Sequence, residues 1–227
     1  VQDDTAALAR VGWAVRRLTG GPRPEVDLAA FVDRRDPENL ANEAESFADR
    51  AGGWLDVMAQ AADLHPISRA CMGFHLWSLA GLGQHGDRVE AAVTAARIAT
   101  SEGRGAIFVP LAMGGAGGLR AGGTAADRLV RWLVGMETAS RTAMRHLDDI
   151  EAWTERAEAE MARLSGRTPP ALRAVLSEWP LASAPMAAVL TGASRAAVQR
   201  NLAWMEERGL VREVTGQGRY RMWRATN

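Results

Sequence analysis

Apolar residues recur every three or four positions along most of the chain, which is the spacing of one face of an α-helix. Before residue 102 this pattern predicts helices over residues 3–18, 26–32, 37–64, 66–82 and 87–101. The segment 66–82 is apolar on nearly every side, so we expect it to be the buried centre of a helical domain. From residue 124 to residue 164 the apolar period stays close to 3.5 residues and predicts one long helix, with Gly135 or Ser140 as a candidate break.

A domain boundary is predicted where this long pattern ends, in the run Ser-Gly-Arg-Thr-Pro-Pro at residues 165–170. The charge balance changes sign there. Residues 167–227 contain nine arginines and four glutamates, a net charge of +5, whereas residues 1–166 contain 18 basic and 23 acidic residues, a net charge of −5. We therefore expect a helical domain over residues 1–166 and a basic C-terminal domain over residues 167–227.

The C-terminal segment predicts three short helices followed by a hairpin. The helices are expected over residues 169–179 and 183–190, and from an N-cap at Ser194 to a stop at Gly209. Two strand-like runs, residues 210–214 and 220–224, flank a glycine-containing turn. This order is typical of a winged helix-turn-helix with a two-stranded wing, so the expected fold class is mainly α, with a helical domain followed by a winged helix.

Long hydrogen-bonding side chains on the third helix point to nucleic-acid recognition. A helix held by its apolar face can lie in the major groove and present such side chains to base edges, while basic residues on a hairpin reach phosphates. The predicted DNA-binding residues are Arg195, Gln199, Arg200 and Asn201 on the helix and Gln217, Arg219 and Arg221 on the wing. The predicted function is sequence-specific transcriptional regulation, with double-stranded DNA as the partner. A protein-interaction or assembly factor whose winged helix binds protein remains the alternative.

Two segments of the chain resemble a family. The run Pro180 to Met186, and above all the run Arg212 to Trp223, resemble the C-terminal helix-turn-helix domain of an uncharacterised bacterial family that is common on plasmids of rhizobia-like bacteria. The start Asp3-Asp4-Thr5 and the arginine after His85-Gly86-Asp87 are similar to that family too. The resemblance implies DNA binding, transcriptional regulation, no catalytic residue, and a further N-terminal domain that this chain would lack.

The wing is also similar to the C-terminal winged helices of Fic-type proteins, through the run Thr-Gly-x-Gly-Arg-Tyr at residues 215–220. The His-Pro-Phe and Gly-Asn-Gly-Arg motif of those enzymes is absent from this sequence. Adenylyl transfer is therefore not expected.

Candidate catalytic and cofactor sites are weak. Six glycines lie between residues 114 and 123, and Gly117, Gly122, Gly123 and Thr124 have the frame of a phosphate-binding loop after a strand-like run, but no lysine is present. A flexible loop is the preferred interpretation.

The histidines and the acidic residues near them give no metal-site pattern. No two of the four histidines have the spacing of metal ligands on a helix, and Asp148, Asp149 and Glu151 beside His146 are typical of a solvated face. Cys71 is expected to be a buried apolar residue. We expect no enzyme activity, cofactor or metal.

The composition agrees with a globular protein, since 47% of the residues are apolar and 24% are charged. No segment has the roughly 18 uncharged apolar residues of a transmembrane helix, and Val1 does not begin a signal-peptide pattern, so we expect a cytoplasmic protein that does not contact a membrane. The long helix predicts a homodimer through the helical domain. Some apolar residues of that domain could also surround a small-molecule effector pocket, although at helical spacing such residues more often form an ordinary core: Trp54, Met58, Met72, Phe74 and Trp77.

Overall fold

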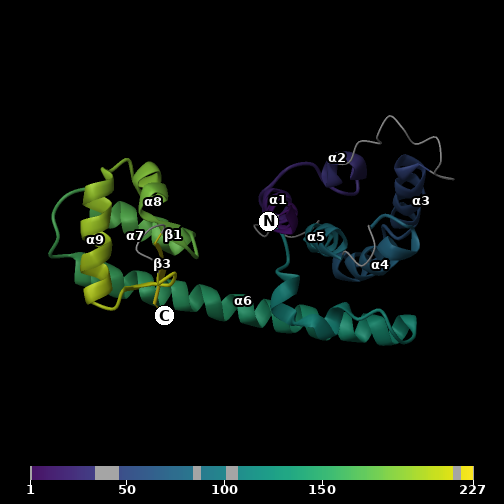
Figure 1. Ribbon diagram of the computed structural model, residues 1–227. Coiled ribbons are helices and arrows are strands. Elements are labelled where there is room, and N and C mark those ends of the chain that lie inside the picture. Colours follow the sequence, from purple (N-terminus) through teal and green to yellow (C-terminus); the bar gives the residue numbers. More distant parts are fainter. Residues whose placement is uncertain (1, 34–45, 84–87, 101–106, 217–220, 227) are drawn as a thin grey trace. The chain divides into compact units, whose positions relative to one another are not determined.

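The computed structural model describes residues 2–33, 46–83, 88–100, 107–216 and 221–226, and it is mainly helical. The chain divides into two compact units, residues 1–143 and residues 144–227, and the division falls inside the long helix α6 (Ala125–Met161) (Figure 1). Each unit has its own hydrophobic core. Among the described helices, none is long and apolar enough to cross a membrane.

Except for the helix predicted from residue 37, the helices of the first unit begin within two residues of where the apolar pattern predicts them. Its helices are α1 (Gln2–Thr19), α2 (Leu28–Val32), α3 (Phe47–Gln60), α4 (Pro66–Leu79), α5 (Val89–Ile98) and the first part of α6. α3 begins after a capping box in which Ser46 and Asp49 satisfy each other's backbone N–H groups. The expected helix over residues 37–64 is thus shorter, and its predicted start lies outside the described residues.

The core of the first unit is centred on α4, in agreement with its apolar sequence. Trp54 of α3 and Trp77 of α4 pack edge to face with ring centroids 5.7 Å apart, and the Trp54 indole N–H donates to the Gly73 carbonyl at 3.2 Å. Trp54, Met58, Phe74 and Trp77 are all buried, and the core contains them. Ordinary core packing therefore accounts for four of the five residues that suggested an effector pocket. α4 is not buried on every side, because Leu79 is 77% exposed.

The glycine-dense segment is ordered into two short 3₁₀ helices, η1 (Leu111–Gly114) and η2 (Ala116–Leu119), and the run before it forms no strand. The strand of a phosphate-binding frame is therefore wrong, and most of residues 111–119 are 3₁₀-helical. These two short helices approach α6 closely through glycines. The Cα atoms of Gly118 and Gly135 approach so closely that a Cβ on Gly135 would lie 3.2 Å from the Gly118 Cα. Gly135 thus serves packing, and α6 runs through it without a break.

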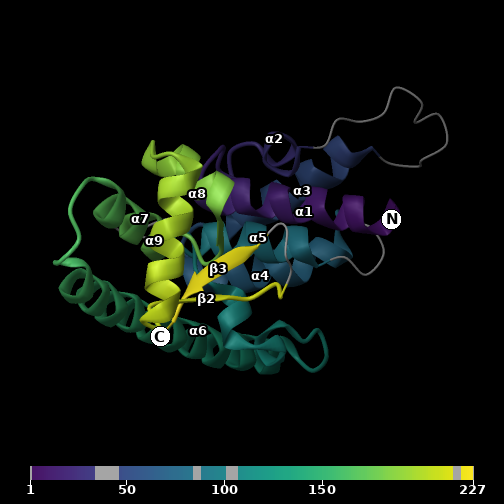
Figure 2. The same ribbon diagram turned by 60° about the vertical axis from the view of Figure 1, so that its left-hand side comes forward.

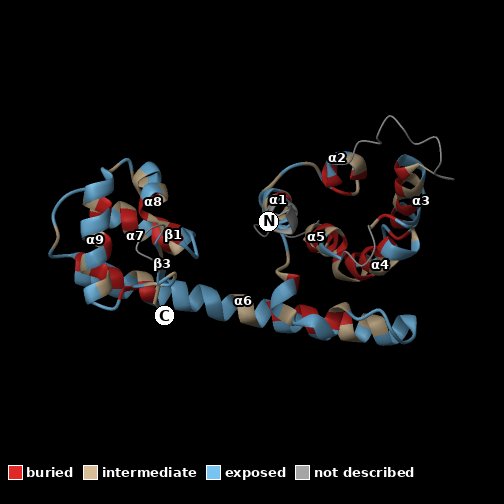
Figure 3. Ribbon diagram, viewed as in Figure 1, coloured by how far each residue is buried: buried red, intermediate tan, exposed pale blue. Residues whose placement is uncertain are grey.

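The second unit contains the end of α6, then α7 (Thr168–Glu178), α8 (Ala184–Thr191) and α9 (Arg195–Glu207) with a small antiparallel sheet. The sheet has the order β1 (Ala182–Ser183), β3 (Met222–Ala225), β2 (Val211–Glu213). Strands β2 and β3 were expected, whereas β1 was not. β2 lies next to α9 (Figure 2), and the buried faces of α7, α8 and α9 belong to one core (Figure 3).

The end of α6 belongs to this second core. Trp153, Ala157 and Met161 are spaced four residues apart and are all buried in it. Contacts therefore divide the chain at residues 143 and 144, within α6, and not at the loop at residues 165–170 where the sequence suggested a boundary. The reason is that the start of α6 packs in the first core and its end packs in the second, while the apolar period continues along the whole helix. The sequence pattern therefore does not change at the division.

Candidate nucleic-acid interface

The start of helix α9 is fixed by its local sequence. Gly192, with φ +67°, ends α8, and the Ser194 hydroxyl then caps α9 by accepting from the Ala197 N–H at 3.2 Å. On the inner side Val198, Leu202 and Met205 are completely buried. These contacts fix which face of α9 is turned to solvent.

The exposed face of α9 carries three of the predicted DNA-binding residues. Arg195, Gln199 and Arg200 are exposed, and so are Ala196 and Ala203, which lie between them on the same face. None of the three long side chains makes an ion pair or hydrogen bond within the part of the chain that the structure describes. Because the two alanines are short, a flat partner could approach the helix backbone closely while the long side chains contact it.

Asn201 is placed differently from the other three. It is half-buried, and its amide N–H donates to the Ala197 carbonyl of the same helix at 2.9 Å. This side chain therefore contributes to α9 itself and does not extend from its exposed face.

Of the three residues predicted on the hairpin, the structure describes only Arg221. Gln217 and Arg219 lie outside the described residues, so their positions stay predictions. Arg221 forms an ion pair with Glu206 of α9 at 3.4 Å, and its guanidinium lies over the Trp223 ring, 4.8 Å from the centroid. Glu206 also accepts from the Trp223 indole N–H and from the Glu213 backbone N–H. Arg221 thus helps to attach the strands to α9.

Glu213, the last residue of β2, holds the residues that follow this strand. Its carboxylate accepts from the Thr215 hydroxyl and backbone N–H and from the Gly216 N–H. These hydrogen bonds, that of the Thr215 hydroxyl first, lower the pKa of Glu213 below its ordinary value. The role of Glu206 could not be predicted from the sequence, because it depends on contacts between α9 and the strands. The role of Glu213 is local, and an acidic residue two positions before Thr215 was a usable signal that was not recognised.

A pair of arginines on the sheet was also missed. Arg212 of β2 and Arg224 of β3 are directly opposite in the strand register, and both are exposed, whereas Val211 and Trp223 beside them are buried. Like charges at directly opposite positions destabilise a sheet unless an anion lies between or over them. The alternation of buried and charged residues was a usable signal, but the register that pairs these two arginines was not visible in the sequence.

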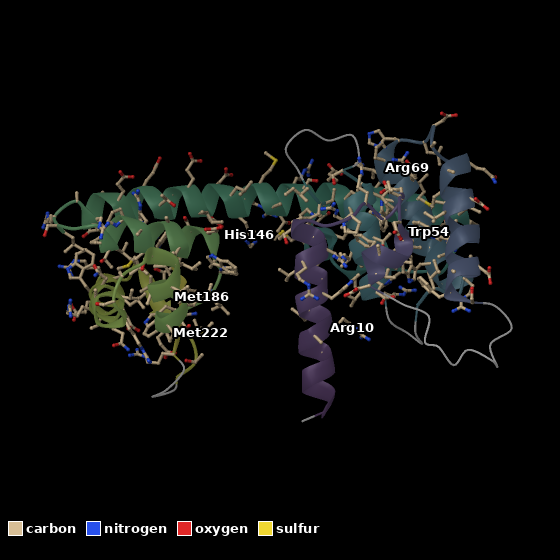
Figure 4. The ribbon with its side chains drawn as sticks, turned by 90° about the horizontal axis from the view of Figure 1, so that it is seen from above. Arg10, Trp54, Arg69, His146, Met186 and Met222 are labelled. Carbon is tan, nitrogen blue, oxygen red and sulfur yellow. The ribbon has the colours of Figure 1, made fainter. Side chains whose placement is uncertain are left out.

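The structure also describes the surroundings of His146 and Cys71, two candidate residues outside the second unit's helix α9. No group of three or more His, Cys, Asp or Glu side chains able to hold a metal ion is found within the described ranges, and His146 lies exposed on α6 (Figure 4). Cys71 is buried, and burial raises the pKa of its thiol to about 11, so the thiol stays neutral near pH 7.

Comparison of the chain with known protein families and with curated proteins finds no match. The function is therefore inferred from the arrangement of residues in the second unit.

Proposed function

We propose that the chain is a sequence-specific DNA-binding transcriptional regulator that acts through a winged helix formed by its C-terminal segment. The observation that carries the proposal is the exposed face of α9, where Arg195, Gln199 and Arg200 extend from a helix whose opposite face is completely buried. The order of helices and strands, with β1 before α8 and with β2 and β3 after α9 in one antiparallel sheet, is compatible with this fold. No acidic residue interrupts the exposed face over the first three turns of α9.

In the proposed complex α9 lies in the major groove. Arginine donates two parallel hydrogen bonds to the O6 and N7 atoms of guanine. Glutamine pairs most readily with adenine, since its amide N–H donates to N7 and its amide oxygen accepts from the N6 amino group. Arg195, Gln199 and Arg200 would therefore read base edges. Arg212 and Arg224 would contact phosphates, which relieves the repulsion between the two guanidinium groups. Glu206 would orient the strands by its contacts with Arg221 and Trp223.

The first prediction separates base readers from phosphate contacts. Arg200→Ala is expected to cost about 1 to 3 kcal/mol of binding free energy and to relax the preference at one base position. Arg212→Ala is expected to weaken binding equally for all sequences and to reduce the dependence of log K on log salt by about 1. The measurement is a selection of the full chain against random duplex DNA, followed by fluorescence anisotropy titrations at several salt concentrations.

Arg163→Ala is the matched control, since Arg163 is exposed and lies beyond the end of α6. It should leave both the affinity and the salt slope unchanged. If Arg200→Ala loses the same binding free energy on every DNA sequence, α9 does not read bases. If the full chain binds no duplex at low salt, a partner protein becomes the better occupant of the α9 face.

We also propose that the regulator is a homodimer through α6. Part of the apolar period of this helix serves the chain's own cores, since Met136, Ala157 and Met161 are buried. The middle of α6 is different, because Met144 and Leu147 are each 64% exposed and Ile150 is 38% exposed. A two-fold dimer suits a symmetric operator, whose half-sites lie about 34 Å apart.

The dimer is tested by Leu147→Glu, which places a charge in the exposed apolar stripe. We expect this variant to be monomeric at tens of micromolar by light scattering, where the unchanged chain has the mass of a dimer. Ala152→Glu is the control, because Ala152 is exposed on another side of α6 and should keep the dimer mass. A monomer mass for the unchanged chain would leave α6 as an element of the two cores alone.

A further inference from the structure

The first unit contains a cavity between α4 and the beginning of α6. Its volume is about 380 Å³, within the range of small-molecule sites. Its walls are mainly apolar and include Met72, Leu76 and Leu129, and its edge includes Leu64 and Leu79, which are 46% and 77% exposed. Large apolar side chains at an opening to solvent are a feature of sites that accept an apolar molecule from water.

One positive charge lines this cavity. Three arginines lie close enough to His75 to influence its protonation, namely Arg88, Arg128 and Arg131. Arg88 donates to the Leu119 carbonyl at 2.7 Å, and Arg131 donates to the Gly122 carbonyl, so both are occupied by backbone oxygens. Arg128 is the one that lines the cavity, and its guanidinium has no ion pair or hydrogen bond within the described residues.

The other polar groups of the cavity do not neutralise Arg128. None of the described residues that line the cavity is acidic, and the Cys71 thiol stays neutral. The Nε2 atom of His75 is buried without a hydrogen-bond partner among the described residues. Burial first, and then the positive charges of the three arginines, lower the pKa of His75, so this imidazole is neutral near pH 7. A negative charge brought into the cavity would therefore meet a cation and no carboxylate.

We propose that this cavity binds a small amphipathic carboxylic acid, with its unbranched aliphatic body against the apolar walls and its carboxylate paired with Arg128. An arginine and a carboxylate form two parallel hydrogen bonds, and the surrounding apolar side chains exclude the water that would weaken them. The aliphatic body would contact Met72, Leu76 and Leu129. This site belongs to the first unit, and it does not depend on the function proposed for the second.

The test uses decanoate as the probe and 1-decanol as its uncharged counterpart, titrated into the full chain by calorimetry. We expect decanoate to bind with one molecule per chain. Arg128→Gln should weaken decanoate binding roughly tenfold to a hundredfold, the range for a hydrogen bond to a charged group, and should change 1-decanol binding by less than about twofold. Arg145→Gln removes the same charge from the exposed middle of α6 and should leave both affinities unchanged.

A second pair of variants tests whether the cavity itself is the site. Ser68→Phe places a ring in the cavity and should abolish binding of both probes, whereas Ser78→Phe, on an exposed position of the same helix, should not. Circular dichroism must show that each variant keeps the helix content of the unchanged chain. The proposal is overturned if decanoate does not bind, if Arg128→Gln binds it as tightly as the unchanged chain, or if folded Ser68→Phe still binds it. DNA binding by the same preparations reports on the function proposed for the second unit separately.

Discussion

Replacing Trp153 by alanine is expected to destabilise the second unit by about 3 to 5 kcal/mol, the range for truncating a buried tryptophan. Trp153 is 1% exposed and lies in one core with Leu172, Leu202 and Trp223. Its indole N–H also donates to the Leu210 carbonyl at 2.7 Å, at the residue before β2. The substitution therefore leaves a cavity in the core and a backbone carbonyl without its partner.

Two further variants separate these contributions. Trp153→Phe keeps an aromatic ring in the core but removes the donor, so it should cost less than Trp153→Ala. Trp179→Ala is the matched control, because Trp179 is 41% exposed at the end of α7 and should cost well under half as much. The measurement is urea unfolding of the full chain by circular dichroism, together with hydrogen exchange of amides in α7, α8 and α9.

If Trp153→Ala lowers the protection of amides against hydrogen exchange only in α7, α8 and α9, the end of α6 stabilises the second unit. Equal unfolding midpoints for Trp153→Ala and Trp179→Ala would contradict this and would favour the boundary suggested by the charge change at residue 167. The experiment thus decides between two descriptions of the chain that differ in the role of residues 144–166.

Local signals in the sequence were sufficient to predict most of the helices. Ser194 caps α9 and Gly209, with φ +66°, follows its end, as their residue types suggest. Such features act over a few residues, so they can be recognised without knowledge of the fold. The buried positions of α4 and Cys71 followed from apolar composition for the same reason.

Features that depend on distant contacts could not be predicted. β1 has only two residues, Ala182 and Ser183, and exists through its pairing with β3. Arg212 and Arg224 become a pair only through the register of β2 and β3. The cavity beside Arg128 requires α4 and α6 to be placed side by side. Each of these involves residues more than ten positions apart, whose contact the hydrophobic period does not specify.

In the candidate interface, too, some features follow from the local sequence and others depend on contacts between distant residues. The exposure of Arg195, Gln199 and Arg200 follows from the helical period, because Val198 and Leu202 fix the buried side. The engagement of Arg221 by Glu206 does not follow from any local pattern. Positive charge alone could not distinguish an arginine that is available to a partner from one that is already paired.

The glycine-dense segment provides the second large prediction, because its glycines differ in what surrounds them. A Cβ on Gly114 would lie 2.2 Å from the carbonyl oxygen of Gly135 in α6, a distance that real Cβ atoms essentially never show. The obstacle is backbone within a continuous helix, so it cannot rotate away as a flexible side chain would. Gly117 is its counterpart in η2, with nothing within 4 Å of an added Cβ.

Gly114→Ala is expected to destabilise the first unit by about 3 kcal/mol, the upper end for overpacking, because η1 must move away from α6 to admit the methyl group. Gly117→Ala should change the free energy of unfolding by less than about 1 kcal/mol and in the stabilising direction, since alanine restricts the unfolded chain. Urea unfolding of the full chain, with hydrogen exchange of amides in α4 and α5 to assign the loss to the first unit, is the measurement. If the two variants have the same midpoint, the segment does not pack against Gly135, and the flexible loop predicted from its composition is the better description.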